Sequence, residues 1–171
     1  ESNGTCVKCE CGKYSDVVGA STNTCQDCDA GKYAPGTGND DETDCELCAM
    51  GKYFASGGQC EDPCLDCAAG KYLDSTGNDA ETQCVECECG EYSTVDSMMF
   101  DECQDCVAGK YSSASGNDEE TDCDQCVAGK YSTDTAACDD ICVECGVGKY
   151  SSEQGNNNET DCQLCPAGKY L

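Results

Sequence analysis

Cysteine is the residue that most constrains this chain, because 22 of its 171 residues are Cys. Leu, Ile, Val and Phe together make up only about a tenth of the chain, less than a globular domain normally contains. The formal net charge is -26. That composition alone indicates disorder, since too little apolar surface is available to offset chain entropy. Dense cysteine is instead typical of small domains held by disulfides, which persist in oxidising compartments. We therefore expect a string of small cross-linked modules and no single large core.

One motif, C-x-x-C-x-x-G-[KE]-Y, occurs nine times and contains all nine tyrosines of the chain. The residue number of its glycine rises by 19 and by 20 in alternation, and such regular self-similarity is the signature of a tandem repeat protein. We number the repeats as modules 1 to 9, each ending at the residue before the next motif, so that the even-numbered modules are the longer ones. The modules begin at Cys6, Cys25, Cys45, Cys64, Cys84, Cys103, Cys123, Cys142 and Cys162.

A longer period of four modules lies above the single module, and it adds 78 to the residue number. Shifting the chain by this length superposes the ten cysteines from Cys6 to Cys67 on those from Cys84 to Cys145. We therefore predict three parts: 1–83, a first super-repeat of four modules with its N-terminal lead-in; 84–161, a second super-repeat; and 162–171, the start of a third. Ala167 stands where the pattern places a cysteine, so the third super-repeat departs from the first two. Because both ends lie inside the repeat, we expect the chain to be a segment of a longer polypeptide.

Each module is expected to form a short irregular β-hairpin. Gly-Lys-Tyr starts one extended leg, a Gly-Asn-Asp or similar run makes the turn, and Glu-Thr-Asp-Cys returns. No stretch shows the apolar period of an amphipathic helix. The predicted fold class is small and disulfide-rich: an elongated tandem array of short irregular β-hairpin modules of length 19 or 20, with little or no helix.

The motif tyrosine is the only large apolar group in most modules. We expect it to cover the disulfide of its own module and to leave its hydroxyl at the surface. The alternative is a row of tyrosines that faces a ligand. The predicted packing residues are Tyr14, Tyr33, Tyr53, Tyr72, Tyr92, Tyr111, Tyr131, Tyr150 and Tyr170.

C-x-x-C pairs serve zinc sites, thioredoxin-like redox sites and structural disulfides. The spacers between successive pairs have the length found in a zinc ribbon, but the chain has no His and carries four further cysteines in fixed places. A redox site uses one pair beside a βαβ unit, whereas nine pairs repeat here without one. We therefore predict structural disulfides, with no metal and no cofactor.

Repetition narrows the disulfide connectivity to two schemes. In the first, the second Cys of each motif bonds to the first Cys of the next, and each loop of roughly 16 residues contributes about 3 kcal/mol in the chain-entropy model. The four extra cysteines then pair only across modules or chains. The second, preferred scheme is local and forms Cys11–Cys28, Cys45–Cys60, Cys89–Cys106 and Cys123–Cys138, so that only Cys6 and Cys165 stay unpaired. Six bonds belong to both schemes: Cys9–Cys25, Cys48–Cys64, Cys67–Cys84, Cys87–Cys103, Cys126–Cys142 and Cys145–Cys162.

The run Cys67-Ala-Ala-Gly-Lys-Tyr, followed by Gly77-Asn-Asp-Ala-Glu-Thr-Gln-Cys84, resembles the cysteine-rich repeats of the tumour-necrosis-factor-receptor and ephrin-receptor-like types. The resemblance covers essentially the whole chain. It implies rods of small disulfide-linked modules with crossed pairings, first to third and second to fourth cysteine. The regular Lys-Tyr pairs and acidic turns look most like long surface proteins of protists and algae, such as those of flagellar hairs (mastigonemes).

The acidic charge argues against nucleic acid and anionic membrane surfaces as partners. No apolar run approaches the roughly 18 residues of a membrane span, so we expect no direct membrane insertion in this segment. Acidic runs such as Asp40-Asp41-Glu42 and Asp118-Glu119-Glu120 are expected to be solvated turns, with bound calcium as the alternative. Two N-x-[ST] sequons predict glycans on Asn3 and Asn158.

No catalytic constellation is recognisable, because the chain has no His and no Arg and no module departs from the repeat to supply a nucleophile, a base and an oxyanion donor. We predict a non-enzymatic extracellular or cell-surface protein whose partners are copies of itself or related repeat chains, and glycans. The primary hypothesis is a structural subunit of a filament or stalk, because the repeat returns one surface at fixed intervals. The alternative is a receptor-type ectodomain that binds a protein ligand. The one irregular apolar cluster is Met98-Met99-Phe100, which either docks another chain or plugs a neighbouring disulfide.

Overall fold

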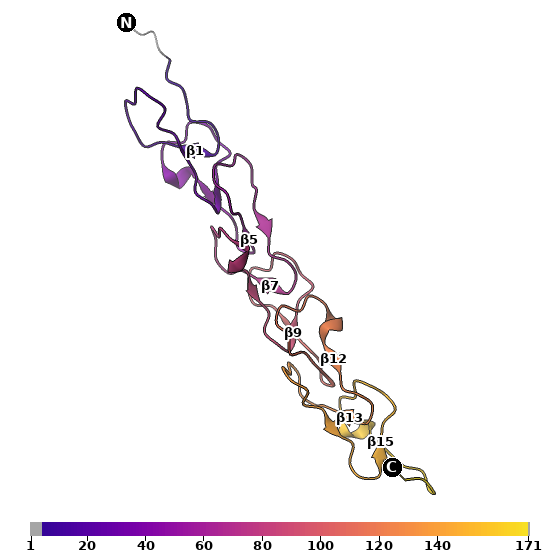
Figure 1. Cartoon of the computed structure of the whole chain (residues 1–171). Helices are drawn as coiled ribbons and strands as arrows, with labels where there is room; N and C mark the ends of the chain where they lie inside the picture. The colour runs from indigo at the N-terminus through magenta and orange to yellow at the C-terminus, as the bar shows by residue number, and fades with distance from the viewer. Residues whose placement is uncertain (1–4, 171) are drawn as a thin grey trace. The chain divides into compact units, whose positions relative to one another are not determined.

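The computed structural model describes residues 5–170, and its regular structure is confined to very short elements (Figure 1). Every strand has two residues, each of the four 3-10 helices has three, and no α-helix occurs among the described residues. The strands are β1 (Lys13–Tyr14), β2 (Gln26–Asp27), β3 (Lys32–Tyr33), β4 (Glu46–Leu47), β5 (Lys52–Tyr53), β6 (Leu65–Asp66), β7 (Lys71–Tyr72), β8 (Val85–Glu86), β9 (Glu91–Tyr92), β10 (Gln104–Asp105), β11 (Lys110–Tyr111), β12 (Asp124–Gln125), β13 (Lys130–Tyr131), β14 (Val143–Glu144), β15 (Lys149–Tyr150) and β16 (Gln163–Leu164). The 3-10 helices are η1 (Glu42–Asp44), η2 (Glu81–Gln83), η3 (Glu120–Asp122) and η4 (Glu159–Asp161).

The strands pair as antiparallel hairpins, and each hairpin joins two consecutive motifs. In the first, Lys13 lies opposite Asp27 and Tyr14 opposite Gln26, so the Lys-Tyr leg of module 1 pairs with the start of module 2. The same register recurs in the pairs β3–β4, β5–β6, β9–β10, β11–β12, β13–β14 and β15–β16. The predicted fold class of small, disulfide-rich hairpin modules with little helix is confirmed.

The described residues form two compact units whose segments alternate along the chain. Unit 1 contains the described part of Glu1–Cys67 together with Leu73–Val85 and Ser97–Phe100. Unit 2 contains Ala68–Tyr72, Glu86–Asp96 and the described part of Asp101–Leu171. Inside each unit, a module contacts both the next module and the module after that. Segments that are separated in the sequence therefore belong to the same unit. The predicted super-repeat boundaries remain predictions.

Disulfides take the place of an aliphatic core. Six cysteines, each the second Cys of its motif, are at most 1% exposed: Cys28, Cys48, Cys67, Cys87, Cys106 and Cys126. Small side chains complete the packing, as in the buried cluster of Cys28, Ala34 and Cys45. A chain with few aliphatic residues thus buries sulfur, which is consistent with the strong tendency of cysteine toward burial.

Two motif tyrosines pack against the disulfide of the following module. Tyr14 of module 1 packs against the Cys28–Cys45 bond of module 2, and Tyr53 packs in the same way against Cys67–Cys84. The backbone holds Tyr14 at this position, since Tyr14 forms a bridge with Asn39 in the turn of module 2. The prediction that each tyrosine covers the bond of its own module stays a prediction.

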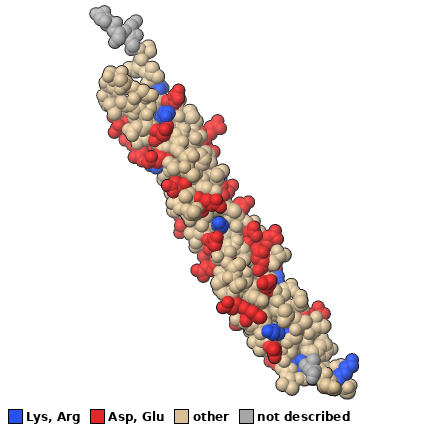
Figure 2. Space-filling view, viewed as in Figure 1, with Lys and Arg blue, Asp and Glu red and all other residues tan. Residues whose placement is uncertain are grey.

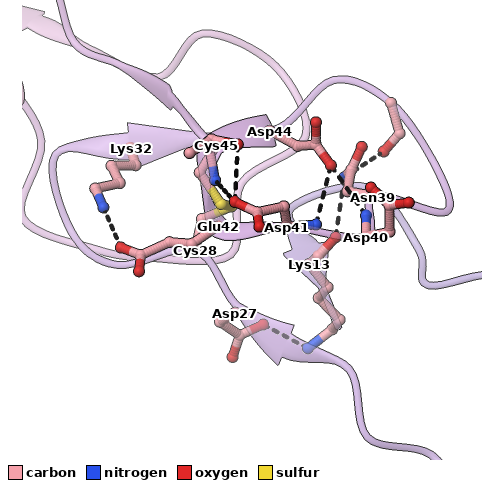
Figure 3. Close-up of a disulfide and its surroundings, with 12 residues drawn as sticks. Lys13, Asp27, Cys28, Lys32, Asn39, Asp40, Asp41, Glu42, Asp44 and Cys45 are labelled. Carbon is pink, nitrogen blue, oxygen red and sulfur yellow. Dashed lines mark hydrogen bonds and ion pairs between the residues drawn. A yellow bond between two sulfur atoms is a disulfide. The ribbon is translucent and has the colours of Figure 1, made fainter. Parts of the chain in front are cut away.

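The turns of the even-numbered modules are held by one of their own side chains, which is an aspartate in modules 2, 6 and 8 and Gln83 in module 4. In module 2, the side chain of Asp44 accepts hydrogen bonds from the backbone N–H groups of Asp40 (2.9 Å) and Asp41 (3.2 Å). The Asp41 carboxylate accepts one from the backbone N–H of Thr43 at 2.9 Å, and this holds the pKa of Asp41 below its usual value. Figure 3 shows these residues beside the Cys28–Cys45 disulfide. In module 2 the turn acids Asp41 and Asp44 therefore cap the 3-10 helix η1.

Candidate functional site: the contacts between modules

Consecutive modules are joined by one disulfide at every step. The second Cys of each motif bonds to the first Cys of the next, and the Cα atoms of each pair lie 5.6 to 5.9 Å apart. All six bonds shared by the two predicted schemes are present. The eight bonds are Cys9–Cys25, Cys28–Cys45, Cys48–Cys64, Cys67–Cys84, Cys87–Cys103, Cys106–Cys123, Cys126–Cys142 and Cys145–Cys162.

The four extra cysteines join modules that are two steps apart. Cys11 of module 1 bonds to Cys60 of module 3 at a sequence separation of 49, with Cα atoms 4.8 Å apart. The bond recurs one super-repeat later between modules 5 and 7 as Cys89–Cys138, at a Cα–Cα distance of 4.9 Å. These two bonds add a direct link between modules that are otherwise connected only through the module between them. They account for the fixed positions of the four extra cysteines in the repeat.

The preferred local scheme is therefore wrong in four bonds, which were Cys11–Cys28, Cys45–Cys60, Cys89–Cys106 and Cys123–Cys138. That scheme assumed that a module contacts only its neighbours in sequence. In the structure, Gly12 meets the backbone of Gly58, and this contact places the adjacent Cys11 next to Cys60. Cys6 and Cys165 have no disulfide partner in the described part of the chain, as that scheme predicted for these two cysteines.

The motif glycine makes the closest contact between modules. Gly12 has a φ of 77°, in the left-handed region that side chains disfavour, and a β-carbon there would lie 2.2 Å from the carbonyl oxygen of Gly58. Gly58 is the turn residue seven positions after the motif glycine of module 3. We call this arrangement, a motif glycine against the turn residue of the module two steps ahead, the stacking contact. Six copies share one spacing along the chain: Gly12/Gly58, Gly31/Gly77, Gly51/Ser97, Gly70/Gly116, Gly90/Ala136 and Gly109/Gly155.

An asparagine in each even-numbered module ties its turn to the preceding module. The Asn156 amide donates to the carbonyl oxygen of Lys130 at 3.0 Å and to that of Glu153 at 2.8 Å, and its own oxygen accepts from the Ser151 hydroxyl at 3.1 Å. Asn78, Asn117 and Asn156 are all buried. The sequence predicted that the Gly-Asn-Asp runs make turns, but this role of the asparagine was not predicted. The signal was present, since the asparagine recurs at equal intervals as Asn39, Asn78, Asn117 and Asn156.

Six of the motif lysines form an ion pair with a nearby carboxylate. Those of modules 6 and 8 reach a glutamate in their own turn, with Nζ–Oε1 distances of 2.8 Å for Lys110–Glu120 and 2.7 Å for Lys149–Glu159. Each lysine holds the pKa of its partner glutamate below the usual value. Modules 1 and 3 instead pair Lys13 and Lys52 with the aspartate directly across the sheet. Acidic side chains otherwise dominate the face drawn in Figure 2, where the lysines are few and scattered.

Module 5 breaks this pattern at Glu91, which replaces the motif lysine. Glu91 lies opposite Asp105 in the sheet of β9 and β10, so two carboxylates face each other. Partial burial, and then the charges of Asp101, Asp105 and Glu88, raise the pKa of Glu91. The Glu91 and Asp101 carboxylates and the sulfur of Cys103 lie within 4.8 Å of one another, but that sulfur is bonded to Cys87. Only two carboxylates therefore remain there as hard-metal ligands, fewer than calcium takes in proteins.

The two predicted glycan sites differ in what the structure describes. Asn158 is exposed at the start of η4, and its Oδ1 atom accepts hydrogen bonds from the backbone N–H and the hydroxyl of Thr160, both at 3.0 Å. A glycan attaches to the other atom, Nδ2, so this cap is compatible with glycosylation. Asn3 lies outside the described residues.

The three residues of the Met98-Met99-Phe100 cluster differ in their exposure. Met98 is 5% exposed, and its backbone carbonyl accepts a hydrogen bond from the N–H of Leu73 at 2.9 Å. Met99 and Phe100 are 50% and 53% exposed. The cluster thus contributes one residue to the interior and two to the surface.

Comparison with protein-family models finds no match for this chain, and comparison with curated proteins finds none either. The resemblance to receptor-type cysteine-rich repeats therefore rests on the motif itself.

Proposed function

We propose that this chain is a structural subunit of an extracellular filament or stalk built from disulfide-stapled repeats. The observation that carries the proposal is the stacking contact, which recurs six times at one spacing. A contact that repeats in this way presents the same backbone and side-chain groups at regular intervals along the chain. Regular intervals suit a lattice contact, which must be made many times, whereas a single ligand site needs one distinct surface.

Covalent bonding supports a mechanical role. Ten disulfides hold the described residues, and two of them brace modules that are two steps apart. Such bonds indicate an oxidising environment, and we place the protein outside the cell or on its surface on that ground. Among the described residues, no helix is long and apolar enough to cross a bilayer.

The proposed partners are copies of this chain or related repeat chains, and glycans. Asn158 is exposed and keeps its capping hydrogen bonds when its Nδ2 atom is modified, which supports a glycan at this position. The resemblance to surface proteins of protists and algae points to the same kind of assembly. We assign no catalytic activity and no cofactor to the chain.

The test is to image the native assembly by electron microscopy and to measure its periodicity. The proposal expects ordered filaments or stalks with a repeat that corresponds to a whole number of super-repeats. Native material that consists of dispersed single chains without periodicity would rule the structural role out.

A receptor-type ectodomain is the second candidate, and module 5 is the observation that favours it. This module contains the exposed Met99 and Phe100 and also the acidic Glu91, so it alone departs from the repeat in both apolar content and charge. Exposed apolar residues on an acidic chain suit a basic protein ligand with an apolar anchor. Capture of one secreted partner that is lost in a Phe100→Asp variant, without any filament, would favour this reading.

A further inference from the structure

Two of the disulfides differ from the other eight in the exposure of their cysteines. We call Cys11–Cys60 and Cys89–Cys138 the brace bonds. All four brace cysteines are partly exposed, whereas each of the eight sequential bonds contains a cysteine that is at most 8% exposed. Cys60 and Cys89 have complete modules on both sides, so their exposure is a property of the repeat. Because thiol–disulfide exchange depends on access to the sulfur, a thiolate in solution attacks the brace bonds more easily than the sequential ones.

The stacking contact does not depend on a brace bond. A brace bond accompanies it at Gly12/Gly58 and at Gly90/Ala136, and the other four copies among the described residues have none. A β-carbon on the motif glycine would lie 2.2 and 2.4 Å from the nearest backbone atom in the two braced copies, and 2.3 to 2.4 Å in the other four. Modules two steps apart thus approach equally closely with and without the bond. Opening a brace bond is therefore expected to leave the fold in place.

The brace bonds also recur with the super-repeat. Cys11 and Cys60 stand 78 positions before Cys89 and Cys138, and one brace bond lies within each compact unit. Each super-repeat of four modules therefore presents one exposed disulfide that the stacking contact does not require.

We propose that the brace bonds are the sites at which copies of this chain become covalently linked, through thiol–disulfide exchange between the brace bond of one copy and that of a second copy. The partner is a second copy because it offers the same exposed disulfide, so the exchange conserves the number of bonds. This inference rests on the proposed structural role, and it names the partner and the linking residues.

The exchange needs a small thiol such as glutathione to start it, and it consumes none. The thiolate attacks the sulfur of Cys60 in the first copy, forms a mixed disulfide there and releases Cys11 as a thiolate. That Cys11 attacks Cys60 of the second copy, which forms one link between the copies and releases the second copy's Cys11. The second Cys11 then attacks the mixed disulfide, which forms the reciprocal link and returns the small thiolate. Every step breaks one S–S bond and forms one, so no oxidant is required.

Charge controls the rate of this exchange. Each brace cysteine has an exposed acidic neighbour in the sequence, and these are Glu10, Glu61, Glu88 and Asp139. Their carboxylates repel an attacking thiolate, and the formal charge of -26 on each copy opposes the approach of a second. Salt screens this repulsion, since the Debye length falls from about 30 Å at 0.01 M to about 10 Å at 0.1 M. The exchange is therefore expected to accelerate as salt is added.

The experiment mixes unlabelled and heavy-isotope-labelled copies of the 171-residue chain. Both carry Cys6→Ser and Cys165→Ser, so that every remaining cysteine lies in a disulfide. A low concentration of reduced glutathione starts the exchange, and alkylation of free thiols stops it. Cleavage at acidic residues, including Glu10 and Glu88, separates Cys11 and Cys89 from the sequential cysteine before each. Mass spectrometry then counts linked peptides that contain one labelled and one unlabelled partner.

We expect such hybrid peptides at the brace cysteines to be at least about tenfold more abundant than at the sequential cysteines. The same mixture in denaturant is the control, because an unfolded chain exposes all ten disulfides and should yield hybrids at every one. Hybrids that are absent from the native mixture, or spread evenly over the ten bonds, overturn the proposal.

A variant without brace bonds provides a second readout. It replaces all four brace cysteines with Ser in the same background: Cys11→Ser, Cys60→Ser, Cys89→Ser and Cys138→Ser. Covalent oligomers on non-reducing gels are expected from the parent and not from this variant, while peptide mapping finds the eight sequential bonds intact. Oligomers that persist in the variant overturn the proposal. Sequential bonds that rearrange in the variant also overturn it, because the fold would then need the brace bonds.

Native material separates this inference from the proposed function. Ordered filaments whose brace bonds all lie within single copies would refute the covalent link and leave the structural role standing. Dispersed single chains without periodicity would remove the structural role itself.

Discussion

Glu91 lies directly opposite Asp105 in the sheet of β9 and β10, at the register position where modules 1 and 3 place a lysine opposite an aspartate. The strand register is the same in all three modules, so this cross-strand pair differs between them in the sign of one charge. Like charges that face each other across an antiparallel pair destabilise it. The same register position thus holds an attractive Lys–Asp pair in modules 1 and 3 and a repulsive Glu–Asp pair in module 5.

Replacing Glu91 with Lys should stabilise the protein. The variant removes the repulsion and creates the cross-strand pair that Lys52 and Asp66 make at 2.9 Å. Because these side chains are partly exposed, the expected gain in the free energy of unfolding is about 0.3 to 1 kcal/mol. Glu153→Lys is the matched control: it changes the net charge equally, and the Glu153 carboxylate makes no hydrogen bond or ion pair to another described residue. Equal denaturation midpoints for the two variants would show that only net charge matters.

The raised pKa of Glu91 predicts a pH-dependent difference between the wild type and Glu91→Gln. A group whose pKa is raised on folding favours the folded state when protonated, and this contribution is lost as pH rises through the folded-state pKa. At pH 7 the wild type therefore carries the cost of an ionised Glu91, and the variant should be more stable by a few tenths of a kcal/mol. As pH falls below the ordinary glutamate pKa of 4.5, the two stabilities should converge. A difference that stays constant from pH 7 to pH 3 would contradict this assignment.

The turn asparagine should matter far more than its neighbour. Asn156→Ala leaves the carbonyl oxygens of Lys130 and Glu153 without the amide donor, in a position that is 7% exposed. The expected loss in the free energy of unfolding is about 1 to 3 kcal/mol. Asn157→Ala removes an exposed side chain one residue later and should change stability by less than about 0.5 kcal/mol. Denaturant unfolding with the disulfides intact measures both, and equal losses would mean that the asparagine is only a turn former.

Alanine substitutions at two motif glycines distinguish the effect of backbone strain on the free energy of unfolding from the effect of the stacking contact. Gly109 and Gly129 have φ values of 85° and 82°, but a β-carbon collides with the backbone of Gly155 only at Gly109. Gly129→Ala should cost about 1 kcal/mol for the left-handed conformation. Gly109→Ala should cost about 2 to 4 kcal/mol, because the turn of module 8 must also shift. Similar unfolding midpoints for the two variants would refute the stacking contact at module 6.

Local features of the fold followed from the sequence because they repeat within one module. Gly-Lys-Tyr, the acidic turn and the returning Cys define a hairpin by their spacing alone, and the structure contains those hairpins. Six of the eight sequential disulfides belonged to both predicted schemes for the same reason, whereas Cys28–Cys45 and Cys106–Cys123 did not belong to the preferred one. A bond between the second Cys of one motif and the first of the next closes a short loop at every step.

Contacts between modules two steps apart were not predictable from these local patterns. Nothing in the spacing of Cys11 and Cys60 marks them as neighbours, because their contact depends on how each hairpin is rotated relative to the next. The burial of the turn asparagine was not predicted for the same reason. In the sequence Asn156 is an ordinary polar turn residue, and only the structure shows that its amide donates to the carbonyl oxygen of Lys130. The recurrence of this asparagine in every second module was the one clue in the sequence.

Disulfide mapping tests most directly the claim that modules two steps apart are in contact. The unreduced protein is cleaved at its acidic residues, and the linked peptides are identified by mass spectrometry. The structure predicts peptides that join Cys11 to Cys60 and Cys89 to Cys138, together with Cys28–Cys45 and Cys106–Cys123. Peptides that join Cys11 to Cys28 and Cys45 to Cys60 would contradict it, because the chain would then be held only by bonds within modules or between neighbouring modules.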